Sequence, residues 1–326
     1  MNVFLTPTIV SLIALAAVYF WGGLAALFLT LVLVILEITL SFDNAVVNAK
    51  VLQEMSGVWQ RRFLTWGMLI SVFGTRLILP IFIVSVVAFV SPITVTYLAL
   101  YNPAQYSELL LGADTAIKAF GGAFLMMVSL KFFFDVGKSV HWFASVEKHL
   151  ARWGRVESIE IALALGLLLL VAIFSHEPAA TILMSGLVGI ILFTLTEGIA
   201  HGLGVEARGV VRSGGILFAY LNLLDTAFSL DGVVGAFAIT NSLPIIFVGL
   251  GIGAYFVRSM TMYLVHKKTL RGLLYLEHGA HWAVFGLGLC MLIGLIVHVP
   301  QIVIALIGLL FITLAYFSSR GQISIS

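Results

Sequence analysis

Long apolar runs, separated by short polar segments, cover most of this sequence. The runs are continuous rather than alternating, which predicts membrane-spanning helices instead of the strands of a closed barrel. They reach or exceed the roughly 18 residues that distinguish a spanning helix from a helix buried in a soluble core. We therefore predict ten spans, at about 4–22, 23–50, 63–90, 115–137, 159–175, 178–199, 214–240, 243–265, 278–298 and 300–317. The junctions at 21–23 and 175–178 are weak, and merging across either one would leave nine spans.

Composition supports a bilayer environment and narrows the function. Of 326 residues, 61% are apolar and only 10% are charged, whereas a soluble domain has about 25% charged residues. The chain has a net charge of +2 but no basic stripe, so we expect no nucleic acid partner. Its single cysteine, Cys290, lies in an apolar run, so no disulfide framework is expected. The common hydrolase and metalloprotease motifs are absent, and we do not expect an enzyme.

The distribution of lysine and arginine predicts the orientation of the chain. The connections at about 91–114, 175–178, 241–243 and 298–301 contain neither residue type, whereas the connections between them are basic. Basic loops stay in the cytoplasm, so both termini are predicted there. Within one basic connection, segment 138–158 combines Trp142, Glu147 and Trp153 with lysines and arginines. This pattern predicts an amphipathic cytoplasmic helix near the membrane interface.

A short acidic motif occurs once in each half of the chain. Both copies have an acid, a serine and an aspartate at the same spacing, offset by 188 residues: Glu37, Ser41 and Asp43, then Asp225, Ser229 and Asp231. The span after each motif carries an arginine, Arg76 or Arg258. In the ten-span arrangement five crossings separate the two motif helices, so the copies run in opposite directions. We therefore predict an inverted-topology repeat with halves 1–175 and 176–326, an architecture of many transporters with midplane sites.

The two copies place different polar groups on one helix face. At 100° per residue the first copy has one polar stripe, made of Glu37, Ser41, Asn44 and Asn48. Gly232 and Ala236 replace the two asparagines in the second copy, so a single asymmetric site is expected. Asp43 and Asp231 point about 120° away from the preceding acids. Either each aspartate faces the opposite repeat, or the helix is unwound near the motif.

Carboxylates inside the hydrocarbon core of a membrane need groups that neutralise their charge. A carboxylate inside a bilayer costs about 2.5–3.5 kcal/mol on insertion scales. Cations, protons or the two arginines could neutralise the motif acids. Carboxylate, amide and hydroxyl oxygens are the ligands that Mg²⁺, Ca²⁺ and Mn²⁺ prefer. We therefore predict metal ligands at Glu37, Asp43, Asn44, Asp225 and Asp231, counter-charges at Arg76 and Arg258, and secondary polar groups at Ser41, Asn48 and Ser229.

Two stretches, Leu36 to Asn48 and Leu224 to Phe237, carry a family resemblance. They resemble the acidic motifs of the TerC family of integral membrane proteins, and the similarity extends over most of the chain. The resemblance implies a bacterial inner-membrane protein, and it implies roles of the family acids for Glu37, Asp43, Asp225 and Asp231. Family members are associated with tellurium-ion resistance and, in several cases, with manganese export. The chain departs from the family at Gly232 and in a longer outer hairpin at 91–114.

These features together predict a membrane transporter that exports a divalent cation, with Mn²⁺ as the first candidate, through an acidic midplane site shared by two inverted repeats. The expected partners are membrane lipid, the cation, and protons exchanged at the same carboxylates. No prosthetic group is expected, and the sequence does not indicate the oligomeric state.

Two alternatives stay open. The chain could be a non-transporting membrane component of a tellurite or metal stress-response complex, or an intramembrane aspartyl hydrolase that uses Asp43 and Asp231. Transport requires acids of both repeats around one polar cavity. A scaffold requires separate, closed acid–arginine pairs, and a hydrolase requires contact between the two aspartates.

Other polar groups also have two interpretations. Glu197 and His201 could form a site where ions enter, although solvated side chains at a helix end are favoured. Asp114 and Glu277 lie near span ends and fit either interpretation.

Overall fold

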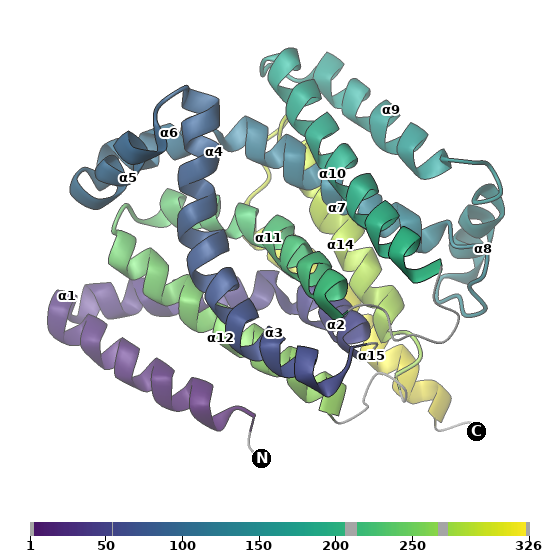
Figure 1. Cartoon of the computed structure of the whole chain (residues 1–326), viewed down its shortest axis with the longest axis horizontal. Helices are drawn as coiled ribbons and strands as arrows, with labels where there is room; N and C mark the ends of the chain where they lie inside the picture. Colours follow the sequence, from purple (N-terminus) through teal and green to yellow (C-terminus); the bar gives the residue numbers. More distant parts are fainter. Residues whose placement is uncertain (1–2, 54, 206–213, 267–272, 324–326) are drawn as a thin grey trace.

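The computed structural model describes the backbone of residues 3–53, 55–205, 214–266 and 273–323. Side chains at 199–205, 230, 231, 238, 266, 301 and 321–323 fall outside this description. Every regular element in the described part is a helix, which confirms the predicted all-α bundle (Figure 1). In chain order the helices are α1 (Leu5–Leu40), α2 (Phe42–Gln53), α3 (Gly57–Leu69), η1 (Ile70–Ile78), α4 (Leu79–Ala88), α5 (Pro92–Tyr101), α6 (Pro103–Gly112), α7 (Asp114–Phe133), α8 (Ala144–Trp153), α9 (Ile159–Phe174), α10 (Ala179–Val205), α11 (Gly214–Ile239), α12 (Leu243–His266), α14 (Leu276–Ile293) and α15 (Gln301–Ile323).

The helices account for the predicted spans. Eight helical segments of the described residues are long and apolar enough to cross a membrane. The longest helix, α1, is interrupted at Gly23, whose φ of 71° and ψ of −165° are accessible essentially to glycine alone. Figure 1 shows α1 bending sharply, so that its second half runs back across the bundle toward α2. The break separates the first two predicted spans.

The fifth predicted span is the shortest. Its helix, α9, has 16 residues and is about 24 Å long, against a hydrocarbon core of roughly 30 Å. It lies beside α10 as a separate helix (Figure 1). Each of the ten predicted spans is therefore helical, although the second combines half of α1 with α2, and the third combines α3, η1 and α4. The proposed division of the chain at 175/176 falls in the connection between α9 and α10.

The two motif helices differ in continuity. The first is broken at Ser41, where α1 ends and α2 begins, so Glu37 and Asp43 belong to different helical segments. The second, α11, runs through Asp225 and Asp231 without interruption. Unwinding near the motif, one of the two expectations, therefore occurs in the first copy only.

The helix that carries Arg76 is also irregular. Between α3 and α4 the nine residues of η1 form a π-helix, in which each backbone hydrogen bond joins residues five apart in the chain instead of four. π-Helical turns are rare and frequently lie at functional sites. The irregular backbone thus coincides with the predicted counter-charge of the first motif.

The outer hairpin at 91–114 is made of two short helices, α5 and α6, that the sequence did not predict. Each helix has proline at its start. The side chains of Ser91 and Asn102 accept hydrogen bonds from backbone N–H groups of the first turns. These caps satisfy donors that a helix start leaves free. Ten-residue helices are too short to give a spanning pattern, which explains why the hydropathy pattern missed them.

Small residues bring α12 close to the second half of α1. A Cβ atom at Gly249 would lie 2.7 Å from the Cβ of Leu33. A Cβ atom at Gly253 would lie 2.5 Å from the Cβ of Glu37. Such small-residue contacts are the usual way in which membrane helices pack closely. The contact between α1 and α12 therefore fixes the position of the Glu37 backbone within the bundle.

We predict that Gly253→Ala destabilises the protein by about 1–3 kcal/mol, as overpacking does elsewhere. The added methyl group would meet the Cβ and Cγ of Glu37, which lie close to the α1 backbone and cannot swing away. Gly251→Ala is the matched control, because its nearest neighbour, Cγ1 of Val72, would be at an ordinary 3.6 Å. Thermal unfolding in detergent should show a lower midpoint for Gly253→Ala only. Equal midpoints for the two variants would contradict the close packing.

Candidate functional site

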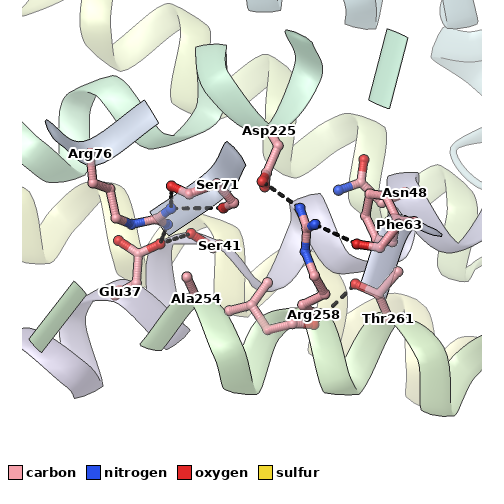
Figure 2. A pocket seen from close by; sticks show the side chains of 11 residues that line it. Glu37, Ser41, Asn48, Phe63, Ser71, Arg76, Asp225, Ala254, Arg258 and Thr261 are labelled. Carbon is pink, nitrogen blue, oxygen red and sulfur yellow. Dashed lines mark hydrogen bonds and ion pairs between the residues drawn. The ribbon is translucent and has the colours of Figure 1, made fainter. Parts of the chain in front are cut away.

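Six of the ten predicted site residues, from both halves of the chain, meet at one buried cavity. The cavity has a volume of about 10 Å³, which is close to the minimum that holds one water molecule. Its polar lining comes from five helical segments and from both halves of the chain: Glu37, Ser41, Asn48, Ser71, Arg76, Asp225, Arg258 and Thr261. Figure 2 shows the two arginines reaching toward one acid each. The convergence of the two motifs, which the sequence predicts, is therefore present.

The first acid–arginine pair joins Glu37 of α1 to Arg76 of η1. The Nη2 of Arg76 contacts Oε1 of Glu37, and both side chains are buried. The Nη1 of Arg76 donates to the carbonyl oxygen of Ser71 at 2.7 Å and to its Oγ at 2.8 Å. The hydroxyl of Ser41 donates to the same Oε1 of Glu37 at 2.9 Å. The residue at the helix break thus helps to hold the first carboxylate.

The second pair joins Asp225 of α11 to Arg258 of α12. The Nη2 of Arg258 donates to Oδ2 of Asp225 at 2.8 Å, and its Nη1 donates to the carbonyl oxygen of Phe63 at 2.8 Å. The guanidinium carbon also lies 3.9 Å from the centre of the Phe63 ring, within cation–π range. Gly67 makes room for this arginine, since a Cβ atom there would lie 2.3 Å from Nη1.

Contacts across the two halves make the pairs parts of one site. Nδ2 of Asn44, on α2, donates to Oδ1 of Asp225 at 2.7 Å. The repeat places Gly232 where the first copy has Asn44, and a Cβ atom at Gly232 would lie 3.3 Å from Oε2 of Glu37. Equivalent positions therefore approach the acid of the opposite copy in both cases. The first position carries the amide of Asn44, whereas the second, Gly232, has no side chain, in agreement with the predicted asymmetry.

Several buried oxygens on the motif helices have no hydrogen-bond partner among the described residues. They are Oδ1 of Asn44, Oδ1 of Asn48, Oδ1 of Asn222 and Oγ of Ser229. Leaving such a group unpaired costs about 1–3 kcal/mol. Buried unpaired groups in a native fold call for a specific explanation, such as a water molecule or an ion. All four are neutral oxygen atoms, the type that a hard cation accepts.

The third motif acid, Asp43, is buried but lies outside both pairs. It is 3% exposed, and its Oδ1 accepts a hydrogen bond of 2.8 Å from the backbone N–H of Asn44 in the first turn of α2. A helix N-terminus stabilises a negative charge. Within the described residues, no lysine or arginine lies within 4.0 Å of this carboxylate. The side chain of Asp231 is outside the described residues, so the aspartate contact that a hydrolase requires stays untested.

The site therefore satisfies two of the competing expectations at once. Both acid–arginine pairs are closed, as a scaffold requires, yet both border one cavity, as transport requires. Among the described residues, no group of three or more His, Cys, Asp or Glu side chains is placed to hold a metal ion. The three described motif acids, Glu37, Asp43 and Asp225, thus do not form a shared metal shell in this conformation, because guanidinium groups occupy Glu37 and Asp225.

Three acids whose role the sequence left open form ion pairs with lysines. Asp114 pairs with Lys118 at 2.5 Å, one turn along α7. Glu277 pairs with Lys50 at 2.9 Å, and Glu197 lies 3.6 Å from Lys131. None of these acids borders the central cavity. The side chain of His201 is outside the described residues.

Glu147 is a buried residue whose role the sequence did not reveal. It lies on α8, inside the segment predicted as an interfacial helix, but it is fully buried. Its carboxylate accepts hydrogen bonds from Nδ1 of His278 at 2.8 Å and from Nε1 of Trp282 at 3.0 Å, and Nζ of Lys138 lies 3.3 Å away. These contacts attach α8 to α14. The four-residue spacing of His278 and Trp282 on one helix face was the available signal.

We predict that removing one partner of a buried acid–arginine pair strongly destabilises the protein, and that removing both partners destabilises it less. Arg258→Met would leave Asp225 charged and unpaired, and we expect a loss of about 3–5 kcal/mol. The double variant Asp225→Asn/Arg258→Met should recover much of this loss. Lys50→Met is the control, because its pair with Glu277 is partly exposed and should contribute at most about 1 kcal/mol. Thermal unfolding of the unchanged protein, the two single variants Asp225→Asn and Arg258→Met, and the double variant measures the coupling, and additive losses would contradict a buried pair.

We predict that the contribution of Glu147 to stability, through the contact between α8 and α14, depends on pH. Burial alone would raise the pKa of Glu147, but the hydrogen bonds from His278 and Trp282 and the charge of Lys138 lower it from 4.5 to about 2. A carboxyl group whose pKa falls on folding stabilises the fold above its unfolded pKa and loses this contribution as the pH falls through its folded pKa. Glu147→Gln should therefore be less stable than the unchanged protein at pH 7, with the difference shrinking between pH 4.5 and 2.

Hydrogen exchange of segment 138–158 measures this difference directly. Glu157→Gln serves as the control, because Glu157 is exposed in the same region. A stability difference that stays constant with pH would show that the Glu147 charge does not hold α8 in place.

Comparison with known proteins places the chain in a family. No curated protein matches the chain. No solved structure matches it either. A family model described as "Protein of unknown function (DUF475)" matches residues 42–322, a region that contains Asp43, the whole second motif and both arginines. Because this match covers most of the sequence, the protein belongs to the DUF475 family.

Proposed function

We propose that this membrane protein transports a divalent cation, with Mn²⁺ as the first candidate, through the cavity between Glu37 and Asp225. The main supporting observation is that two buried acid–arginine pairs border one cavity, together with the unpaired amide oxygens of Asn44, which binds Asp225, and of Asn48, which lines the cavity. Charges in a membrane interior usually mark a pathway, because a purely structural role can be filled at lower cost by apolar side chains. The family description itself supplies no activity.

In this proposal the guanidinium groups hold the cation's place in the empty site. Glu37 and Asp225 together carry two negative charges, which match one divalent ion. When the ion arrives, Arg76 and Arg258 release the carboxylates, and the ion takes over their charge. The free oxygens of Asn44 and Asn48 would add neutral ligands. Closed pairs and a shared cation site are then two states of the same residues.

The backbone near the pairs supports such a rearrangement. The break at Ser41 and the π-helix around Arg76 interrupt regular hydrogen bonding next to the first pair. Discontinuous helices of this kind surround the ion sites of many duplicated transporters. The first half is therefore the one that we expect to move, while the unbroken α11 keeps Asp225 in place.

Mn²⁺, the export direction and the cellular membrane are further parts of this proposal. Oxygen ligands suit Mn²⁺, and the motifs resemble those of the TerC family, some members of which export manganese. Proton exchange at the motif carboxylates would provide the energy, since a cation binds only the deprotonated form. We place the protein in a bacterial inner membrane with cytoplasmic termini, in line with its basic loops.

A structural role is the second candidate, and the closed pairs favour it. A non-transporting membrane component of a stress-response complex would need only that these pairs hold four helices together. It gives no role to the cavity, which Asn48 lines and where the Asn48 amide oxygen has no partner among the described residues. Transport accounts for this oxygen as a ligand.

Flux measurements test the proposal. Purified protein in liposomes that contain a Mn²⁺-sensitive dye should carry Mn²⁺, and Asp43→Ala, Asp231→Ala and Asp225→Asn should each lower the flux at least about tenfold. Glu108→Gln, an exposed acid of α6, is the control and should leave it unchanged. Unchanged flux in Asp225→Asn would rule out the mechanism, because Asp225 is one of the two carboxylates that hold the ion in it. Flux no greater than in empty liposomes would favour the structural role.

A further inference from the structure

A second and much larger cavity lies on the other side of α2. We call it the vestibule; it has a volume of about 550 Å³ and adjoins another of about 470 Å³, with which it shares Lys50, Phe132, Asp135 and Glu277. Asn48 of α2 lines the central cavity, whereas Val47 and Val51 of the same helix line the vestibule. One turn of a motif helix therefore separates the two cavities. Gly154 of segment 138–158, which the sequence predicts to be cytoplasmic, also lines the vestibule.

The vestibule has an excess of negative charge. Four carboxylates line it, from Asp135, Glu160, Glu197 and Glu277, together with the two lysines Lys50 and Lys131. Lys131 lies between two of these acids, 3.7 Å from Glu160 and 3.6 Å from Glu197, and its side chain is 47% exposed. Exposed ion pairs of this kind contribute little to stability. A divalent cation can therefore displace the lysines at small cost.

One side chain in the vestibule is arranged like a metal ligand. His281 is only 9% exposed, and its Nδ1 lies 2.9 Å from the carbonyl oxygen of Glu277. A carbonyl oxygen can only accept, so Nδ1 carries the proton and Nε2 has a free lone pair. The ring is stacked on Phe132 with 3.8 Å between the ring centres, which fixes its orientation. A histidine that ligates a metal typically makes this backbone hydrogen bond with its other nitrogen.

Nε2 of His281 has no hydrogen-bond partner among the described residues, and the ring lines the vestibule. The carboxylate of Glu277 belongs to the same α14 face, one turn earlier. Its only ion pair among the described residues is the one with Lys50, which is 49% exposed. A nitrogen and a carboxylate therefore stand together at the wall of a charged cavity.

We infer that the vestibule is a staging site for a divalent transition-metal ion, bound by Nε2 of His281 and the carboxylate of Glu277. The inference rests on the proposed function for the role of this ion as the transported substrate. Water molecules complete the coordination shell, because the described residues do not offer three strong ligands at one point. A partly hydrated ion binds weakly and leaves easily, as a staging site before the motif helices requires.

The nitrogen ligand gives the site a selectivity that oxygen ligands lack. Mg²⁺ and Ca²⁺ prefer carboxylate, carbonyl and water oxygens, whereas imidazole suits transition metals. His281 thus favours Mn²⁺ and related ions over the more abundant Mg²⁺ before they reach the oxygen-lined central cavity.

Pulsed electron paramagnetic resonance of Mn²⁺ bound to the full chain in lipid nanodiscs tests this inference. We expect a ¹⁴N coupling from the imidazole in the unchanged protein. In His281→Ala this coupling should disappear, and Mn²⁺ affinity should fall at least about tenfold. His149→Ala is the matched control, because the Nδ1 of His149 makes the same bond to the carbonyl four residues earlier, at 2.6 Å, but this side chain is exposed on α8 and lies outside the vestibule. This control should keep both the coupling and the affinity.

Failure of this inference is distinguishable from failure of the proposed function. Absence of the ¹⁴N coupling in the unchanged protein, or equal affinity in His281→Ala, overturns the staging site even if Mn²⁺ flux is present. Asp225→Asn should block Mn²⁺ flux but retain the ¹⁴N coupling. If the unchanged protein shows the ¹⁴N coupling but no flux, the vestibule binds a metal ion in a protein that does not transport it, and only the proposed function fails. If His281→Ala does not fold, Glu277→Gln decides: a tenfold loss of affinity supports the site, and no loss overturns it.

Discussion

Two guanidinium–carboxylate pairs, buried where the helices cross, are the interaction on which the rest of this structure depends. Bringing a charge out of water costs several kcal/mol even after relaxation, so each charged atom needs a partner inside the bundle. The surroundings of Arg258 meet this need, since Gly67 leaves space for it and Phe63 offers both a carbonyl oxygen and a ring face. The π-helix does the same for Arg76, because it presents both oxygens of Ser71 to the guanidinium group.

The two halves of the site are related but not identical. Asn44 binds Asp225 through its amide nitrogen and keeps its oxygen free, whereas Gly232, the equivalent residue of the other copy, leaves space beside Glu37. The helix break at Ser41 also belongs to the first copy alone. The two halves therefore hold similar acid–arginine pairs, but the helix that carries the first acid is interrupted and the helix that carries the second is continuous.

Local sequence signals predicted much of the fold and the members of the site. The apolar runs gave the spans, and the small residues around Gly23 marked the break in α1, because both depend on neighbouring residues in the chain. The repeated spacing singled out Glu37, Asp225 and the two arginines. What the sequence could not supply were contacts between distant segments. The burial of Glu147 against α14, the hydrogen bonds of Arg258 to α3 and the π-helix all depend on the packed bundle.

The closed pairs also bear on how the site responds to the membrane potential. Moving one elementary charge across the membrane changes the energy by about 2.3 kcal/mol per 100 mV. Each pair is electrically neutral, because a carboxylate and a guanidinium group move together. Rearrangement of the paired site therefore does no work against the field, and voltage can act on the empty protein only through groups outside the pairs. On α2, the buried acid outside the pairs is Asp43.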